Sequence, residues 1–281
     1  EVGGNVLHTG VLIGGGMRAI YQDLHRLGRG FVLLWVREPT PAPAMLPPMN
    51  THTLEIMELV AGGDTAAQPV ASIVVLHGLG ADGRDFVPIA QELDLSAIGP
   101  VRFVFPSAPV RPVTLNGGYE MRAWYDIYPP GADPAVPRQE DEAGLRLAQT
   151  IAQALIDREA GRGVPAERTV LMGFSQGCVV ALMAGLRAPQ RLAGLVGLSG
   201  YLALADRTAS EVHAANRTTP IFLAHGEEDD VVVMERGTAA RDALTALGYA
   251  VDWHSYPMGH SVCAEEVADL NAFLLRVLAP D

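Results

Sequence analysis

A serine set between two glycines is the first group in this sequence that could do nucleophilic chemistry. The pentapeptide Gly173-Phe174-Ser175-Gln176-Gly177 follows the apolar run TVLM and precedes the apolar run CVVALMAGL. Flanking glycines allow a sharp turn from a strand into a helix, which strains the backbone at the serine and exposes its hydroxyl. The turn also puts the hydroxyl at a helix N-terminus, where free N–H groups favour developing negative charge. A glycine-flanked serine can also be a plain turn, so the interpretation depends on partners elsewhere.

Two later segments supply an acid and a base for this serine. The apolar run IFLAHG ends in the acidic loop EEDD, where we expect Asp229 rather than Asp230 to be the acid. A short acidic loop is otherwise a solvated turn or a helix cap. His260 follows the last strand-like run in the loop YPMGHS. There an imidazole could take the proton of the Ser175 hydroxyl. The order serine, acid, histidine is the one that a nucleophile on such a sheet requires.

Acyl transfer also needs N–H donors for the tetrahedral oxyanion. The run VVLHGLGADG ends an early strand in glycines, and we assign the backbone N–H groups of Leu79 and Gln176 to this role. The glycines could instead cradle a phosphate, but the run lacks the Lys-Ser/Thr of a P-loop and a full G-x-G-x-x-G. The sequence has no His-x-x-x-His and no cysteine-pair spacing, so we expect no metal and no cofactor.

The other histidines fit structural roles better. His77 and His225 each stand at a strand end before a glycine and out of the required order, so we interpret them as groups that brace turns. His254 falls inside the last predicted strand, as a packed or edge residue. The remaining histidines have no partner context: His8, His25, His52 and His213.

The elements that must position these groups alternate along the chain. Continuous apolar runs predict strands that are covered on both faces, hence an α/β fold with a mostly parallel sheet between helices. The predicted strands are Leu54–Val60, Ser72–Leu76, Val101–Phe105, Thr169–Met172, Gly194–Leu198, Ile221–Ala224 and Val251–Tyr256. The predicted helices are Arg84–Leu93, Glu140–Glu159, Gln176–Leu186, Val233–Leu247 and Ala264–Val277.

Residues 107–138 show no clear period and are rich in proline, glycine and aromatic side chains. A loop of this length in a compact domain is usually functional. Its aromatic residues Tyr119, Trp124, Tyr125 and Tyr128 could form a pocket wall. Alternatively they pack the loop onto the sheet, which we favour for Tyr119 and Tyr128.

The net charge of −12 and the isoelectric point near 5.1 argue against a nucleic-acid or anionic-membrane surface. No apolar run approaches the roughly 18 residues that cross a bilayer. Two cysteines, Cys178 and Cys263, are too few for a disulfide framework, and we expect free thiols rather than a bridge. We expect a cytoplasmic protein, with export as the alternative if the N-terminal segment is a leader.

Residues 1–50 differ in character from the rest. They hold a helix-like segment from Met17 to Leu27, a short apolar run at 31–36 and the proline-dense EPTPAPAMLPP. With Met49 as an initiator they would be a non-native leader; otherwise they form an N-terminal extension that caps the domain or serves as a dimerising arm. We expect residues 51–281 to be the catalytic domain.

Five motifs in order give the chain a family resemblance. The motifs are HGLGADGRDF (77–86), SAPVRPVTLNGGYEMRAWYDI (107–127), GFSQGC (173–178), HGEEDDVVV (225–233) and YPMGHSV (256–262). Together they resemble the phospholipase/carboxylesterase family of α/β-hydrolases, which includes acyl-protein thioesterases. The resemblance runs from about Thr53 to the C-terminus. It departs in two respects: family members usually have proline where Asp230 stands, and the residues before about 50 have no counterpart in the family.

The resemblance implies an α/β-hydrolase fold, with Ser175, Asp229 and His260 as catalytic triad and Leu79 and Gln176 as oxyanion donors. It also implies that Trp124 lines the acyl pocket. We therefore expect a carboxylesterase that cleaves small-molecule esters of short to medium acyl chain through an acyl-enzyme. The alternatives are a lysophospholipase or acyl-protein thioesterase and, in another class, a non-catalytic scaffold that binds small apolar ligands. A homodimer is compatible with the sequence.

Overall fold

The computed structural model describes residues 11–14, 17–22, 32–37, 54–63, 67–131 and 139–279. The chain divides into two compact units, Glu1–Pro48 and Met49–Asp281. In the first unit, three strands form an antiparallel sheet: β1 (Val11–Gly14), β2 (Met17–Gln22) and β3 (Val32–Arg37).

The helix predicted from Met17 to Leu27 is therefore wrong for its first half. Residues 17–22 form the central strand β2, which pairs with β1 on one side and β3 on the other. Strand pairing with two neighbours satisfies the backbone groups of this short segment, and that non-local gain overrides a local helical pattern. Residues 23–27 lie outside the described residues.

The second unit is built on a seven-stranded sheet with the order β12-β11-β10-β9-β5-β6-β4. Its edge strand β4 is antiparallel to β6, and all other neighbours are parallel. The inner strands are buried along almost their whole length, as continuous apolar runs predict. The strands are β4 (Ile56–Ala61), β5 (Ala71–Leu76), β6 (Val101–Pro106), β9 (Thr169–Phe174), β10 (Gly194–Leu198), β11 (Ile221–Gly226) and β12 (Val251–Tyr256).

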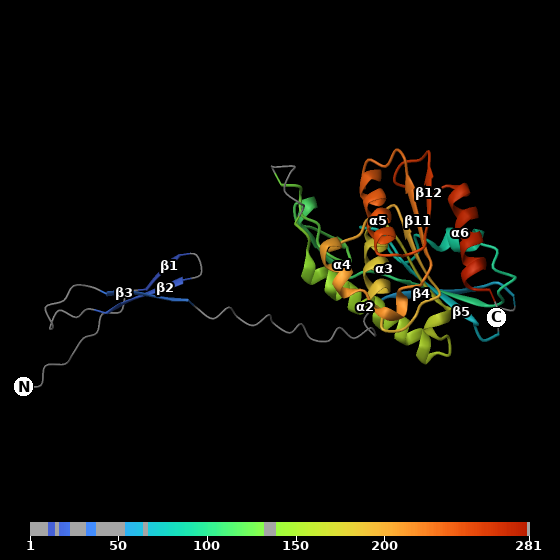
Figure 1. Cartoon of the computed structure of the whole chain (residues 1–281), viewed down its shortest axis with the longest axis horizontal. Coiled ribbons are helices and arrows are strands. Elements are labelled where there is room, and N and C mark those ends of the chain that lie inside the picture. Colours follow the sequence, from blue (N-terminus) through green and yellow to red (C-terminus); the bar gives the residue numbers. More distant parts are fainter. Residues whose placement is uncertain are drawn as a thin grey trace, which may run out of the picture. The chain divides into compact units, whose positions relative to one another are not determined.

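Helices cover both faces of this sheet, as the α/β prediction requires. One hydrophobic core lies between the sheet and helices α2, α3 and α5; the other lies under α1 and α6. Figure 1 shows α6 across the strands from α3 and α5. The helices are α1 (Val87–Glu92), α2 (Glu142–Gly161), α3 (Gln176–Arg187), α4 (Ala205–Glu211), α5 (Met234–Ala246) and α6 (Ala264–Val277). Among the described residues, no helix has the length and apolarity needed to cross a bilayer.

The order of the strands sets where a site can form. From β5 the chain crosses to β6 on one side, and then returns to β9 on the other side of β5. A crevice opens outside the carboxyl ends of parallel strands at such a switch in strand order. The segments that follow β5 and β9 begin at His77 and Ser175, so both stretches singled out in the sequence meet at this crevice.

Two segments differ from the sequence prediction. The segment 107–138 contains a hairpin of β7 (Val110–Val113) and β8 (Tyr119–Arg122), and its residues 132–138 lie outside the described ones. The packing role favoured for Tyr119 is wrong, because its side chain is 70% exposed at the hairpin. Helix α4 was not predicted. Its first turn depends on Glu140, whose carboxylate accepts a hydrogen bond from Leu204 N at 2.9 Å, so a distant segment fixes where this short helix begins.

Candidate active site

Ser175 occupies a strained turn between β9 and α3. Its φ is 54° and its ψ is −116°, values that cost a non-glycine residue about 1–3 kcal/mol. The two flanking glycines are required by close packing. A Cβ on Gly173 would lie 2.1 Å from Gly177 O, and a Cβ on Gly177 would lie 2.0 Å from Leu76 O. The sequence prediction of a glycine-dependent turn is confirmed, and Ser175 remains partly exposed at its apex.

The segment after β5 runs directly against this turn. A Cβ on Gly78 would lie 3.4 Å from the Ser175 Cβ, so the neighbouring Leu79 is held close to the nucleophile. Neither Leu79 N nor Gln176 N donates to a backbone carbonyl in the turns and loops that the structure describes. Two such donors beside one serine are the arrangement that an oxyanion hole needs.

Asp229 and His260 meet beside the turn. Asp229 Oδ2 accepts a hydrogen bond from His260 Nδ1 at 2.7 Å, and Asp229 Oδ1 accepts from the Val231 and Val232 amides at 3.0 and 2.8 Å. The Asp229 side chain is fully buried, whereas Asp230 is exposed. A carboxylate can only accept, so Nδ1 of His260 carries the proton and Nε2 keeps its lone pair.

Two loops bring this pair together. The turn after β11 donates from Glu227 N to Tyr256 O at 2.8 Å and from Glu228 N to Met258 O at 3.0 Å. A Cβ on Gly226 would lie 2.3 Å from Met258 O, so only glycine lets the loops approach this closely. The imidazole of His260 then lies against Phe174, the residue before the serine, with 4.7 Å between ring centroids.

Gln176 ties the turn to the long segment after β6. Its side-chain Oε1 accepts from Trp124 N at 2.8 Å, and its Nε2 donates to Tyr125 O at 2.8 Å. The indole of Trp124 donates to His77 O at 2.9 Å and is only 1% exposed. In this structure Trp124 is thus a buried brace of the site. Its predicted contact with an acyl chain stays a prediction.

His77 and His225 brace turns, as the sequence predicts. His77 accepts from Ala108 N at 2.9 Å through Nε2, and its Nδ1 lies 2.7 Å from Gly78 O, so the ring links the segments after β5 and β6. Burial lowers the pKa of His77, which favours the neutral ring that this pairing needs. His254 lies in the edge strand β12, as predicted, and stacks on Phe222 of the neighbouring strand β11. Cys178 and Cys263 are both free thiols.

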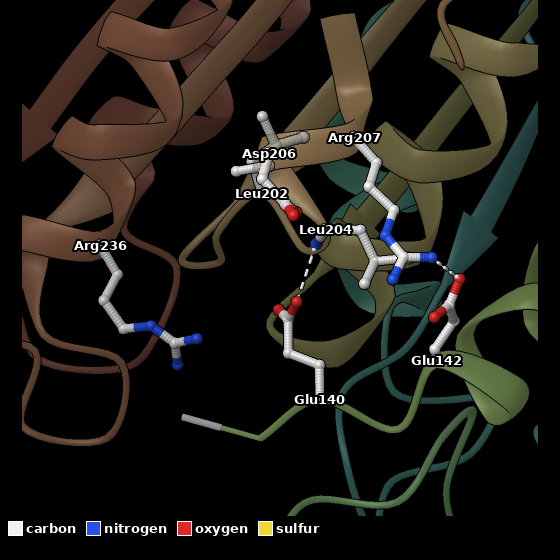
Figure 2. Close-up of a pocket in the computed structure, with 8 residues that line it drawn as sticks. Glu140, Glu142, Leu202, Leu204, Asp206, Arg207 and Arg236 are labelled. Carbon is white, nitrogen blue, oxygen red and sulfur yellow. Dashed lines mark hydrogen bonds and ion pairs between the residues drawn. The ribbon is translucent and has the colours of Figure 1, made fainter. Parts of the chain in front are cut away.

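A hollow of about 720 Å³ lies near the carboxyl ends of the strands, between the loop after β10, the start of α4 and the first turn of α5 (Figure 2). Five of its eight lining residues are charged, so it suits a polar group better than a hydrocarbon chain. On one wall the guanidinium of Arg236 stacks 3.4 Å from the ring centroid of Tyr201. The Tyr201 hydroxyl lies 3.0 Å from that of Tyr125. This contact links the wall to Gln176, whose side chain donates to the backbone oxygen of Tyr125.

Comparison of the chain with known proteins shows which family it belongs to. The model of the family described as phospholipase/carboxylesterase matches residues 56–278, most of the chain. The chain belongs to the phospholipase/carboxylesterase family. Members of this family are serine hydrolases of carboxylic esters, and the resemblance inferred from the five sequence motifs is confirmed.

Relatives within the phospholipase/carboxylesterase family include thioesterases and esterases. Acyl-protein thioesterase 1 of Neurospora crassa is 41% identical over 217 residues, which are 75% of this chain and 89% of that protein. Among solved structures, SOBER1 of Arabidopsis thaliana is 31% identical with a TM-score of 0.68, covering 74% of this chain and 99% of that one. Esterase PE8 is 29% identical with a TM-score of 0.65, covering 79% and 99%. These neighbours confirm the α/β-hydrolase fold.

The sequence interpretation missed two supporting residues of this family member. The side chain of Gln176 was assigned no role, although it makes two hydrogen bonds to the backbone of residues 124 and 125. The sequence predicts for His225 only a role in bracing a turn, although its Nε2 lies 3.5 Å from Asp229 Oδ2. The repeated His-Gly at the ends of β5 and β11 was the available signal for His225. No local pattern links Gln176 to a segment some fifty positions earlier.

Proposed function

We propose that this protein is an acyl-protein thioesterase, a serine hydrolase that releases a fatty acid from an S-acylated cysteine of a protein or peptide. The observation that carries the chemistry is the Asp229–His260 hydrogen bond beside the strained Ser175 turn. The choice of a thioester substrate rests on the relatives, because acyl-protein thioesterase 1 of Neurospora crassa is matched over 89% of its length.

In the proposed mechanism, His260 Nε2 takes the proton of the Ser175 hydroxyl while Oγ bonds to the acyl carbon. Asp229 holds the imidazole in the required tautomer, and the N–H groups of Leu79 and Gln176 hold the oxyanion. The C–S bond then breaks, and the leaving thiolate takes the proton from His260. Water then gives a proton to His260 and attacks the acyl carbon. The C–O bond to Ser175 breaks, the fatty acid leaves, and His260 returns the proton to Ser175 Oγ.

Hydrolysis of short to medium carboxylic esters is the second candidate. It was the first choice from the sequence, and the likeness to esterase PE8 over 99% of that chain supports it. An oxygen ester and a thioester pass through the same tetrahedral intermediate, so one triad serves both. We assign either activity to residues 51–281 and propose no function for residues 1–50.

The test is a substrate panel on the full chain. A long-chain S-acyl peptide, a p-nitrophenyl butyrate ester and a lysophospholipid are compared at equal enzyme concentration. We expect the highest kcat/KM for the S-acyl peptide. If only the short ester is cleaved, the second candidate replaces the first.

Ser175→Ala tests the chemistry itself. Loss of a triad nucleophile lowers kcat by about 10⁶, so the variant is expected to show no measurable turnover. Ser210→Ala is the matched control, because Ser210 is exposed on α4 and its Oγ donates, among the described residues, to Arg207 O alone, at 2.9 Å. Stoichiometric labelling of wild type by a fluorophosphonate, absent in Ser175→Ala, excludes the non-catalytic scaffold. Full activity in Ser175→Ala overturns the proposal.

A further inference from the structure

His225 is a buried imidazole at the end of β11, and it stands next to the Asp229 carboxylate. Its side chain is 1% exposed, and its Nε2 lies 2.6 Å from Val232 O and 3.5 Å from Asp229 Oδ2. The Val232 carbonyl can only accept, so Nε2 carries the proton and donates. The positive end of this N–H therefore lies beside the carboxylate oxygen that also binds His260.

The bond to Val232 O has a second effect on the carboxylate. Asp229 Oδ1 accepts hydrogen bonds from Val231 N and Val232 N, so the turn 229–232 folds around the acid. By holding the Val232 carbonyl, His225 fixes the peptide groups of this turn in the orientation that points both amides at Oδ1. The carboxylate is then set in one rotamer, with Oδ2 directed at His260 Nδ1.

The His225 ring itself has little freedom. It stacks on Trp253 of β12 with 6.5 Å between ring centroids. On its other edge it meets α5, where a Cβ on Gly237 would lie 2.3 Å from His225 Nδ1. The titratable groups that face it are Asp229 and, across a small cavity of about 10 Å³, Cys178, whose pKa is raised to about 12 by burial and which therefore stays a neutral thiol.

We propose that His225 is a positioning residue for the catalytic acid: its Nε2–H holds the turn 229–232 and adds a donor beside Asp229 Oδ2. This inference rests on the proposed function, because it concerns the same triad. A group that acts through Asp229 changes how strongly the carboxylate holds protonated His260. Substrate binding depends on other residues, so KM is expected to stay the same.

The test compares His225→Phe and His225→Gln with wild type, with enzyme concentration set by fluorophosphonate titration. His225→Phe removes the hydrogen bond to Val232 O and with it the fixed orientation of the turn 229–232, so it is expected to lower kcat about tenfold, with KM within about twofold. The acid-side midpoint of kcat/KM moves to lower pH, because a carboxylate that is no longer fixed in one rotamer holds protonated His260 less strongly. Gln places an N–H near the same point, so His225→Gln restores most of kcat and the wild-type midpoint.

Gly237→Ala provides a second test in which every titratable group is kept. Its methyl group would displace the imidazole from the Nδ1 edge, so we expect the same direction of change in kcat and in the pH midpoint. Thr238→Ala is the control on the same helix. In the part of the chain that the structure describes, the Thr238 hydroxyl donates to Met234 O alone, at 3.0 Å, so wild-type behaviour is expected.

The outcomes separate this inference from the proposed function. Ser175→Ala decides whether the triad works at all. With that established, the positioning role is overturned if folded His225→Phe or Gly237→Ala, counted by its fluorophosphonate-reactive sites, keeps the wild-type kcat and the wild-type pH midpoint. A fall in yield of active sites, with unchanged kcat and midpoint per site, also overturns it, because that is the result of a purely structural residue.

Discussion

Asp229 Oδ2 lies 2.7 Å from His260 Nδ1, although 31 residues separate the two in the sequence. The contact exists because β11 and β12 are neighbouring parallel strands, whose carboxyl ends meet at the same edge of the sheet. The loops after them are then joined by two backbone hydrogen bonds, from residues 227 and 228 to residues 256 and 258.

Asp229→Asn is expected to lower kcat by about 10⁴ with little change in folding, because an amide in this place favours the wrong imidazole tautomer. Asp230→Asn is the matched control, since Asp230 is exposed and makes no contact with His260 among the described residues. Steady-state kinetics on both variants decide between the two acids. A larger loss in Asp230→Asn would refute the choice of Asp229.

Gly177→Ala is expected to lower both stability and activity. Its methyl group would lie 2.0 Å from Leu76 O, in backbone that cannot give way, and overpacking of this kind costs about 1–3 kcal/mol or more. For a domain of this size, each kcal/mol lowers Tm by about 2–4 °C. Gly161→Ala, at the end of α2 with nothing within 4 Å of the added Cβ, is the control. Equal Tm values for the two variants would contradict the packing argument.

Glu266→Gln is expected to stabilise the protein increasingly as the pH rises. The Glu266 side chain is fully buried, and this burial raises its pKa from 4.5 to about 8. Between these values the folded chain holds a proton that the unfolded chain releases, so stability of the wild type falls from about pH 4.5 to about pH 8. Tm measured from pH 5 to 9 should diverge in favour of the variant. Glu265→Gln, exposed in the same turn, should follow the wild type.

Glu211→Gln is expected to show the opposite sign. Hydrogen bonds from Arg146, with a further one from Arg187, lower the pKa of Glu211 from 4.5 to about 2. The stabilisation from this carboxylate is complete above about pH 4.5 and is lost as the pH falls toward 2. The variant should therefore have a lower Tm than the wild type at pH 7, and the gap should close in acid. Glu167→Gln, an exposed carboxylate, is the control. A gap that is the same at pH 7 and pH 3 would contradict the assignment.

The predicted strands and helices of residues 54–279 agree with the structure to within a few residues at their ends. Gly194–Leu198, Val251–Tyr256 and Ala264–Val277 agree at both ends. These elements carry their signal locally, since an apolar run or a helical period shows which faces will be buried. The prediction was wrong where distant contacts decide the local structure. Residues 17–22 form β2 because they pair with β1 and β3, and α4 begins where the Glu140 carboxylate accepts from Leu204 N.

The sequence by itself determined the strand-and-helix order, the glycine-flanked turn at Ser175 and the chain order of serine, acid and histidine. All three are read from neighbouring residues, because glycine spacing and apolar periodicity act over a few positions. Only the tertiary structure decided that Asp229 and not Asp230 meets His260, that Gln176 clamps the segment at Trp124, and that His225 stands beside the acid. Those contacts join segments that are distant in the chain, and they form only when parallel strands align their carboxyl ends and bring their loops within hydrogen-bonding distance.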